Sequence, residues 1–356
     1  MNIAMLLSGG VDSSVAMCRL QEAGHTVTAF YLKIWLEDEL SFLGECPWEE
    51  DLYYARLVCE QRGVPLRVES FQKTYWDRVV SYTIAQVRAG FTPNPDMLCN
   101  QQVKFGAFLD AFGDKFDAVA TGHYACVAHE PDGSHLYTTP DPIKDQTYFL
   151  AYLSQWQLSR ALFPLCGLNK PEVRALAEQY ALPNMQRKDS QGICFLGKIK
   201  FPDFIRAHIG EQEGELIESE TGRVVGTHRG FWFFTIGQRQ GIGLSGGPWY
   251  VVAKDSKHNR VLISKQYYDG RKARDTFLVT ACNWFVSSPR NEEILEVKLR
   301  HGPQRHRAQV FTRLQGDLLV RLLGGADQGI APGQFAVFYR GNECLGGGCI
   351  AEELVV

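Results

Sequence analysis

The sequence predicts an α/β protein whose doubly wound parallel sheet is followed by a small central β-containing domain and a C-terminal β-barrel. Two observations carry this prediction. The first half of the chain alternates short apolar strands with helical patterns, and from about Gly214 the pattern changes to short strands separated by glycine-rich turns. At 356 residues the chain is long enough for two or three domains.

The elements of the first half follow one another as parallel pairing requires. Strands are expected at 2–7, 26–35, 64–71 and 116–123, and helices at 13–24, 49–63, 100–113, 170–182 and 200–210. Right-handed crossovers then bring the carboxyl ends of the strands to one edge of the sheet, where ligands bind in such folds. Ser8–Ser13, Trp35 and Thr121–Tyr124 would gather at this edge.

The end of the chain has a different texture. It contains five or six short strands with turns between them, which predicts a small closed barrel. The predicted domains are therefore residues 1–200, which bind the nucleotide, residues 201–270, which form the central domain, and residues 271–356, which form the barrel.

Composition excludes several classes of protein. The net charge of −3 does not attract a polyanion, so any RNA contact must come from local basic patches. The chain has no apolar run of the roughly 18 residues that cross a bilayer, so we expect no membrane partner and a cytoplasmic location. The ten cysteines contain no C-x-x-C pair, which argues against a zinc ribbon, and most are expected to be buried thiols.

The first motif is Ser8-Gly9-Gly10-Val11-Asp12-Ser13, between a strand and a helix. Glycines let the backbone approach an anion at a helix N-terminus, and the serine hydroxyls can donate to phosphate oxygens. Asp12 would be unfavourable beside phosphate unless it holds a bridging Mg²⁺ ion. The alternative is a plain strand–turn–helix in which Ser8 or Asp12 caps the helix.

Two further segments each present a cysteine. In "TPNPDMLCN" a rigid loop would deliver Cys99 to a helix that Asn100 caps, where the pKa of a thiol falls, and Asp96 could transfer a proton. In "RKDSQGICFLG" a turn at Gly192 precedes Cys194, beside two cations. For each segment alone, a buried cysteine is at least as good an interpretation.

Together these stretches resemble one family. "SGGVDSSV", "TPNPDMLCN", "KFGAF", "ATGHY", "KDQTYFL", "KPEVRALA", "KDSQGICFLG", "TIGQRQGIG" and "CLGGGCI" are similar to the tRNA-specific 2-thiouridylase (MnmA/TrmU) family of the PP-loop ATP-binding superfamily. The similarity runs over essentially the whole chain. It implies a PP-loop (adenine nucleotide alpha hydrolase-like) domain, ATP and Mg²⁺ as cofactors, and a tRNA substrate.

The resemblance also implies roles for residues. The ATP site would be formed by Leu6, Leu7, Ser8, Gly9, Gly10, Val11, Asp12, Ser13, Leu32 and Gly122, with Asp12 reaching Mg²⁺ through phosphate. Cys99 matches the family's nucleophile, Cys194 its persulfide carrier and Asp96 its proton-transfer group. The target base and the tRNA would be contacted by Asn94, Pro95, Asp96, His123, Lys144, Asp145, Gln146, Arg300, His301 and Gln334.

The implied reaction is adenylation of the uracil C2 oxygen at the wobble position, followed by sulfur transfer that leaves a Cys99–Cys194 disulfide. A cysteine desulfurase or a sulfur-relay protein would supply the persulfide to a monomeric enzyme that acts on lysine, glutamate and glutamine tRNAs.

Three alternatives remain open at this stage. An amidotransferase-like PP-loop synthetase would need a glutaminase, a sulfur-carrying or RNA-binding protein would not use ATP, and an iron–sulfur cluster could involve Cys99, Cys194 and Asp96. The cluster is the less favoured reading, because only two thiols have motif support.

Overall fold

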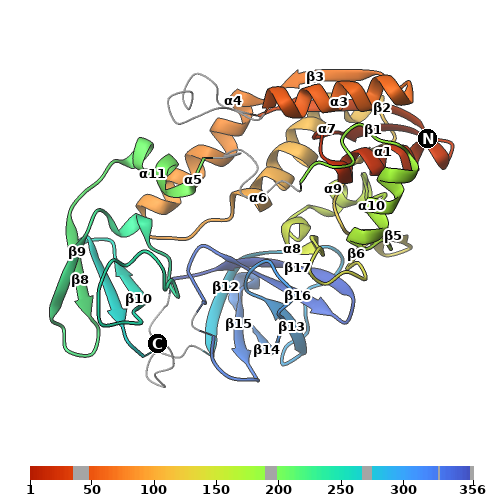
Figure 1. The fold of residues 1–356 in the computed structure, drawn as a ribbon. Coiled ribbons are helices and arrows are strands. Elements are labelled where there is room, and N and C mark those ends of the chain that lie inside the picture. The colour runs from red at the N-terminus through yellow and green to blue at the C-terminus, as the bar shows by residue number, and fades with distance from the viewer. Residues whose placement is uncertain (35–47, 189–198, 267–274, 328, 353–356) are drawn as a thin grey trace.

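The first strand, β1 (Asn2–Leu6), lies at the centre of a parallel sheet in the computed structural model, which describes residues 1–34, 48–188, 199–266, 275–327 and 329–352 (Figure 1). Within those ranges the strand order is β3-β2-β1-β4-β7. The other strands are β2 (Thr26–Lys33), β3 (Leu66–Ser70), β4 (Ala118–Ala120) and β7 (Ala161–Leu162). The chain moves outward from β1 through β2 to β3 and then returns to the other side of β1, so the strand order reverses between β1 and β4. Such a reversal is where α/β sheets bind ligands.

Helices cover both faces of this sheet because β1 is apolar on both. Ile3 and Met5 pack against α1 (Val11–Glu22), α3 (Trp48–Arg62) and α10 (Lys170–Gln179). Ala4 and Leu6 face the opposite core. Its helices are α4 (Gln72–Tyr75), a π-helical turn (Trp76–Val80), α5 (Ser81–Arg88), α6 (Pro95–Leu98), a π-helical segment (Cys99–Ala107), α7 (Phe108–Phe112) and a 3-10 turn (Gly113–Lys115). The doubly wound sheet is confirmed.

The central domain is a small β structure beside α11 (Phe201–Ile209), and it encloses its own core around Leu216, Phe231 and Trp249. Its described strands pair in the order β10-β11-β8-β9. They are β8 (Gly214–Glu218), β9 (Val224–His228), β10 (Tyr250–Asp255) and β11 (Arg260–Ser264), with a 3-10 turn at Phe231–Phe233. This confirms the expected central domain.

The C-terminal domain is the predicted closed barrel, because β12 pairs both with β15 and with the last strand, β17. Its strands are β12 (Thr276–Trp284), β13 (Ile294–Lys298), β14 (His306–Thr312), β15 (Leu318–Leu322), β16 (Phe335–Arg340) and β17 (Glu343–Ile350), with a 3-10 turn at Leu314–Gly316. The barrel interior is apolar and includes Val279, Val297, Val310 and Phe338.

A hairpin from the N-terminal part of the chain joins the barrel sheet. β5 (Cys126–Glu130) and β6 (Gly133–Tyr137) pair with each other, and β6 then pairs with β17, where Leu136 lies opposite Cys344. The short helices α8 (Thr147–Leu150) and α9 (Gln155–Ser159) follow it. The sequence analysis assigned no strands here, because the neighbour of β6 comes about 200 residues later in the chain. None of the helices in the described ranges is long and apolar enough to span a membrane.

A buried ion pair also fastens the barrel to the N-terminal domain. Lys298 Nζ at the end of β13 lies 2.7 Å from Asp145 Oδ2, and each side chain is only 2% exposed. The Thr147 hydroxyl donates to the same carboxylate, and Lys298 lies 5.3 Å from the centre of the Tyr339 ring. The pair is thus hydrogen-bonded and shielded from water, so removal of either partner leaves an uncompensated buried charge.

We expect Lys298→Met to lower the free energy of unfolding by about 3–5 kcal/mol, because it strands Asp145 in the interior. Urea denaturation followed by circular dichroism measures this loss. The control is Arg260→Met, which breaks an ion pair of similar length (2.9 Å, to Glu215) whose side chains are 44% and 43% exposed. The control should cost about 0–1 kcal/mol, and equal losses in the two variants would contradict the structural role of Lys298.

Candidate functional site

The loop between β1 and α1 has the geometry of an anion-binding turn. Gly9 adopts a positive φ of 76°, and Gly10 precedes α1 without a side-chain cap. The Ser13 hydroxyl donates to the Gly10 carbonyl (3.0 Å) and lies 3.1 Å from the Ser8 hydroxyl. The backbone N–H groups of the first turn of α1 therefore point out of an uncapped helix N-terminus, which favours a bound phosphate. Leu6, Leu7 and Val11 are buried, so any contact they make with a nucleotide is through the backbone.

Asp12 is held by Tyr124, which the sequence places at this edge of the sheet, and by Lys170, which the sequence does not single out. Lys170 Nζ, at the first position of α10, lies 2.7 Å from Asp12 Oδ1, and the Tyr124 hydroxyl donates to the same oxygen at 2.9 Å. The N-termini of α1 and α10 therefore converge on one spot. In the sequence, Lys170 followed by proline indicates only the start of a helix, because proline is common in the first turn. Without the fold, this pattern does not show that Lys170 reaches Asp12.

Two further side chains hold the phosphate loop through the Gly9 carbonyl. The side chains of Asn184 and Arg187 both donate to the Gly9 carbonyl, at 2.8 and 3.1 Å. Arg187 in addition pairs with Asp51 Oδ1 at 2.9 Å. Arg187 stands seven residues before Cys194, which lies outside the described residues. The base of the Cys194 segment is thus attached directly to the phosphate loop.

Gly122 and Leu32 lie near the carboxyl ends of the two strands that flank β1. A Cβ at Gly122 would come within 2.7 Å of the Ser13 backbone nitrogen, so the end of β4 packs directly on the start of α1. Leu32 is the penultimate residue of β2, and β2 is the neighbour of β1 on the other side. Both residues are therefore at the carboxyl edge of the sheet, as predicted, beside the place where the strand order reverses.

The helix that carries Cys99 begins earlier than predicted. Asn94, not Asn100, is the N-cap: its side chain accepts the Met97 N–H at 3.1 Å, and Pro95 occupies the first turn. The prediction that Asn100 caps this helix is wrong, because Asn100 is buried and donates to the Phe149 carbonyl (3.0 Å). Cys99 lies one turn inside the helix, is fully buried, and begins the π-helical segment. Cys99 therefore lies one turn past the helix start, not at the start where the sequence placed it.

The turn that precedes the Asn94–Asp96 segment is packed against the barrel. The Thr92 N–H donates to the Pro332 carbonyl at 2.8 Å, and a Cβ on Gly333 would lie 2.8 Å from the Phe91 Cβ. This contact places Gln334, one residue further, beside the turn that leads into α6. The structure therefore brings together two segments that are about 240 residues apart in sequence.

His301 reaches the same region. Its ring stacks on Phe149 with 4.6 Å between the ring centres and 21° between the planes. The partial loss of water contact lowers the pKa of His301, the positive charge of Lys298 lowers it further, and the Asp96 carboxylate acts in the opposite direction. His301 and Asp96 are thus within electrostatic reach. Arg300 turns to Asp327, with 3.1 Å between Nη2 and Oδ2.

The Lys144–Gln146 segment links the two halves of the site. Gln146 Oε1 accepts the Tyr124 N–H at 3.0 Å, so this residue touches the strand end that holds Asp12. Asp145 forms an ion pair with Lys298 inside the protein, so its first role is structural. Lys144 is partly exposed.

His123 lies between the phosphate loop and the Cys99 helix. Its Nδ1 is 2.8 Å from the Thr121 hydroxyl, and its ring packs edge-on against Phe163. Burial holds the pKa of His123 well below its ordinary value, and the positive charge of Lys104, on the π-helical segment, adds to the shift. His123 is therefore neutral at pH 7.

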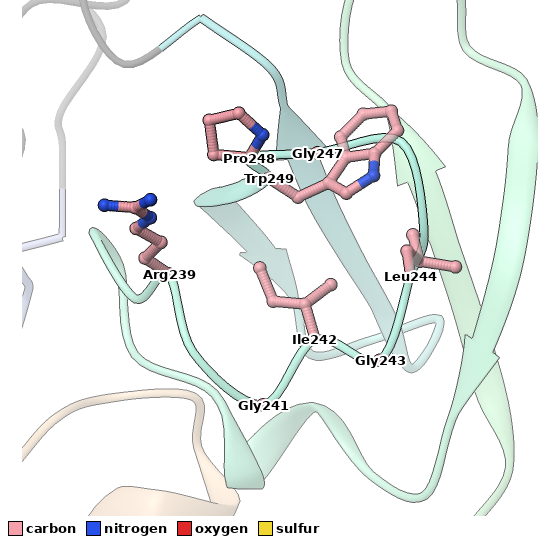
Figure 2. Close-up of a pocket in the computed structure, with 8 residues that line it drawn as sticks. All are labelled: Arg239, Gly241, Ile242, Gly243, Leu244, Gly247, Pro248 and Trp249. Carbon is pink, nitrogen blue, oxygen red and sulfur yellow. The ribbon is translucent and has the colours of Figure 1, made fainter.

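Two hollows lie elsewhere on the molecule. One of about 490 Å³ is in the central domain, where Arg239 and Pro248 face each other across glycine-rich turns (Figure 2). The other, of about 580 Å³, lies between the barrel and the loop before Asp145, and Lys298 and Arg305 line it. Asp145 is the one predicted site residue that lines either hollow. Apart from Asp145, the predicted site residues that the structure describes thus lie outside these two hollows.

Comparisons with known proteins agree with this layout. Residues 1–198 match the model of the tRNA methyl transferase HUP domain, residues 202–265 that of the tRNA methyl transferase PRC-barrel domain, and residues 274–350 that of the aminomethyltransferase beta-barrel domain. The chain is 44% identical over 359 residues to the tRNA-specific 2-thiouridylase MnmA of Parabacteroides distasonis, with 99% of each chain covered. It is 46% identical over 363 residues to that of Porphyromonas gingivalis, again with 99% of each chain covered.

We expect His123 to stay neutral in the folded protein as the pH falls below 6.5, because its folded pKa is depressed. Protonation then favours the unfolded chain, so the stability that neutral His123 supplies is complete above pH 6.5 and is lost as the pH falls below it. NMR titration of the imidazole signals, assigned with His123→Gln, measures the pKa. Between pH 6.5 and 5.5 the wild type should lose up to about 1 kcal/mol more stability than His123→Gln. An imidazole that titrates at pH 6.5 or above would contradict the expectation.

Proposed function

We propose that this chain, which belongs to the tRNA-specific 2-thiouridylase family, converts the wobble uridine of tRNA to 2-thiouridine with ATP and a persulfide sulfur. The observation that carries the proposal is the Asp12 cradle. An uncapped glycine loop, a lysine ammonium and a carboxylate meet at the reversal point of a parallel sheet. Membership of the family supplies the reaction class, and the cradle supplies a place for the nucleotide.

Activation is the first step of the proposed reaction. The C2 oxygen of uridine is a poor leaving group, and attack of this oxygen on the α-phosphorus of ATP turns it into the oxygen of AMP. The departing pyrophosphate gains negative charge, which the first-turn N–H groups of α1 and the Lys170 ammonium would stabilise. Asp12 would hold Mg²⁺, which would supply further neutralisation of the phosphates.

Sulfur transfer is the second step. A cysteine desulfurase or a relay protein would load a persulfide on Cys194. Either its terminal sulfur attacks C2 and Cys99 resolves the adduct, or Cys99 first releases sulfide that attacks C2. Both routes expel AMP and leave a Cys99–Cys194 disulfide, which a reductant must cleave before the next cycle. Asp96 would move the proton at N3.

The burial of Cys99 adds a condition to this step. Its side chain is fully enclosed by the core of the N-terminal domain, so neither a base nor a persulfide reaches it in the described conformation. We infer that the Asn94–Asp96 turn and its contacts with the barrel shift when tRNA binds. Gln334, His301 and Lys144 are the proposed contacts that transmit tRNA binding to this turn. The tRNA set and the monomeric state are part of the same proposal.

Nucleoside mass spectrometry tests the proposed reaction. Unmodified lysine, glutamate and glutamine tRNA transcripts would be incubated with protein, ATP, Mg²⁺, reductant and a persulfide-generating desulfurase. We expect 2-thiouridine from the wild type and none from Cys99→Ala or Cys194→Ala, while both variants keep tRNA-dependent release of pyrophosphate. Thiouridine formation by Cys99→Ala would contradict the role proposed for Cys99. Release of pyrophosphate by the wild type without thiouridine would favour another product, such as that of an amidotransferase-like enzyme. Iron in anaerobically purified protein would favour a cluster mechanism.

The Asp12 cradle makes a second prediction. Lys170→Met leaves a carboxylate beside the phosphates without its cation, so we expect ATP binding to weaken about tenfold to a hundredfold. Lys170→Arg keeps the charge and should recover part of the loss. Isothermal titration calorimetry with a non-hydrolysable ATP analogue measures the affinity.

The matched control for Lys170→Met is Lys73→Met. Lys73 makes an ion pair of the same length, 2.7 Å, with Asp77, but its side chain is 89% exposed and remote from the loop. The Lys73→Met variant should bind the ATP analogue as tightly as the wild type does. Wild-type affinity in Lys170→Met would remove Lys170 from the proposed site.

A further inference from the structure

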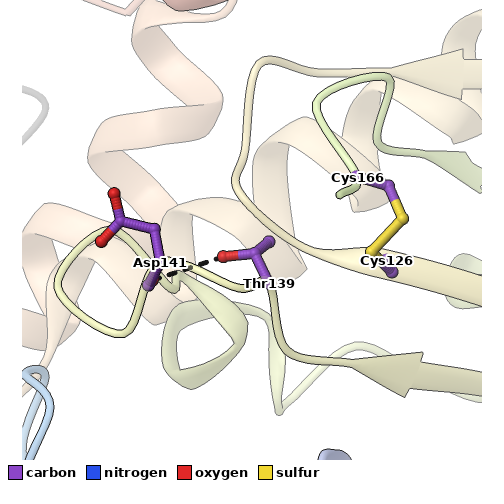
Figure 3. Close-up of a disulfide and its surroundings, with 4 residues drawn as sticks. All are labelled: Cys126, Thr139, Asp141 and Cys166. Carbon is purple, nitrogen blue, oxygen red and sulfur yellow. Dashed lines mark hydrogen bonds between the residues drawn. A yellow bond between two sulfur atoms is a disulfide. The ribbon is translucent and has the colours of Figure 1, made fainter. Parts of the chain in front are cut away.

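One disulfide corrects the expectation for two of the cysteines. Cys126 and Cys166 are bonded to each other, with 4.8 Å between their Cα atoms and 40 residues between them in sequence. The bond joins the start of β5 to the turn between β7 and α10 (Figure 3). Cys166 is exposed and Cys126 is partly buried, so small thiols in solution can reach the bond from the Cys166 side.

The two bonded segments are those that hold Asp12. Tyr124 stands two residues before Cys126, and Lys170 stands four residues after Cys166. Both side chains contact Asp12 Oδ1, at 2.9 and 2.7 Å. The disulfide therefore ties together the backbones of both residues that position the carboxylate of the phosphate loop.

The Asp141–Gln146 segment also contacts both Tyr124 and Lys170. The Lys170 N–H donates to Asp141 Oδ2 at 3.3 Å, and Gln146 exchanges backbone and side-chain hydrogen bonds with Tyr124 at 2.9 and 3.0 Å. The Thr139 hydroxyl donates to the Asp141 carbonyl in the turn that leads into this segment (Figure 3). Without the disulfide, the Tyr124 and Lys170 segments meet only through non-covalent contacts of this kind.

We propose that Cys126 and Cys166 form a thiol–disulfide exchange site for low-molecular-weight thiols, and that its oxidation state sets the affinity of the Asp12 cradle for the nucleotide. The identity of the nucleotide rests on the proposed function. The pair is separate from the two cysteines of the sulfur-transfer step.

The oxidant in this exchange is a small disulfide, RSSR. The Cys166 thiolate attacks one sulfur of RSSR and releases RS⁻, which leaves a mixed disulfide on Cys166. The Cys126 thiolate then attacks the Cys166 sulfur and releases the second RS⁻. One S–S bond forms in the protein and one breaks in the reagent. The two cysteine protons pass to the two released thiolates, and the reverse sequence reduces the protein.

The bonded form should bind the nucleotide more tightly. The disulfide limits the relative motion of the Tyr124 and Lys170 segments, so less freedom is lost when phosphate binds. A preorganised site of this kind is expected to bind about threefold to tenfold more tightly than its reduced form.

The test compares two redox forms of the full-length protein. Samples would be equilibrated with oxidised or reduced glutathione and then freed of it, and peptide mass mapping after alkylation would confirm the state of Cys126 and Cys166. The affinity for a non-hydrolysable ATP analogue would be measured in both forms by calorimetry, for the wild type, for Cys126→Ser/Cys166→Ser and for the control Cys282→Ser. Should the double variant not fold, Cys166→Ser replaces it, since Cys166 is exposed.

For the wild type and for Cys282→Ser, we expect the oxidised sample to bind the ATP analogue more tightly than the reduced sample. For the double variant, we expect the same weak affinity in both samples. Equal wild-type affinities would overturn the exchange site and leave the proposed function intact, as would a redox difference that persists in the double variant. Absence of nucleotide binding in every sample, together with absence of 2-thiouridine, would instead overturn the proposed function, and the exchange site with it.

Discussion

The buried ion pair between Asp145 and Lys298 is the constraint on which the arrangement of the domains depends. A buried charge pair tolerates little displacement, because separation of the partners exposes each to an apolar interior. The barrel is therefore held against the N-terminal domain at a defined position, and the β6–β17 pairing extends the attachment. This attachment brings the turns that carry His301 and Gln334 to the Asn94–Asp96 segment. One side of the candidate site thus exists only because the two domains are fixed to each other.

The nucleotide side of the site rests on a different principle. α1 and α10 direct their positive N-terminal ends toward the same place, and Asp12 and Lys170 neutralise each other between them. A phosphate that enters this place meets N–H donors and one ammonium group without facing an unpaired carboxylate. Arg187 holds the loop from the other side, so the loop and the segment leading to Cys194 are mechanically linked. In the proposed reaction, nucleotide binding and sulfur delivery would then share one framework.

Cys99 is buried in the folded protein, so in the proposed reaction substrate binding would have to expose its thiol. The π-helical segment that begins at Cys99 has wider turns than an α-helix, and Gly106 allows its close approach to the Gln101 carbonyl. In the proposed reaction the Cys99 thiol, which lies in the core, would become exposed when tRNA binds.

The sequence by itself determined the strand–helix alternation around β1, the glycine turn at Ser8–Ser13 and the family, because these are local patterns: a glycine turn between a strand and a helix reads the same in isolation. It also placed the change from α/β to β structure near Gly214 correctly. Only the tertiary structure decided that Lys170 and Tyr124 hold Asp12, that Cys126 bonds Cys166, and that the β5–β6 hairpin joins the barrel. The cap at Asn94 was missed although it is local, because Asn100 offered an equally good capping pattern and packing against Phe149 chose between them. Contacts between residues far apart in sequence have no local signature, since they arise only when separate elements are brought together by the core.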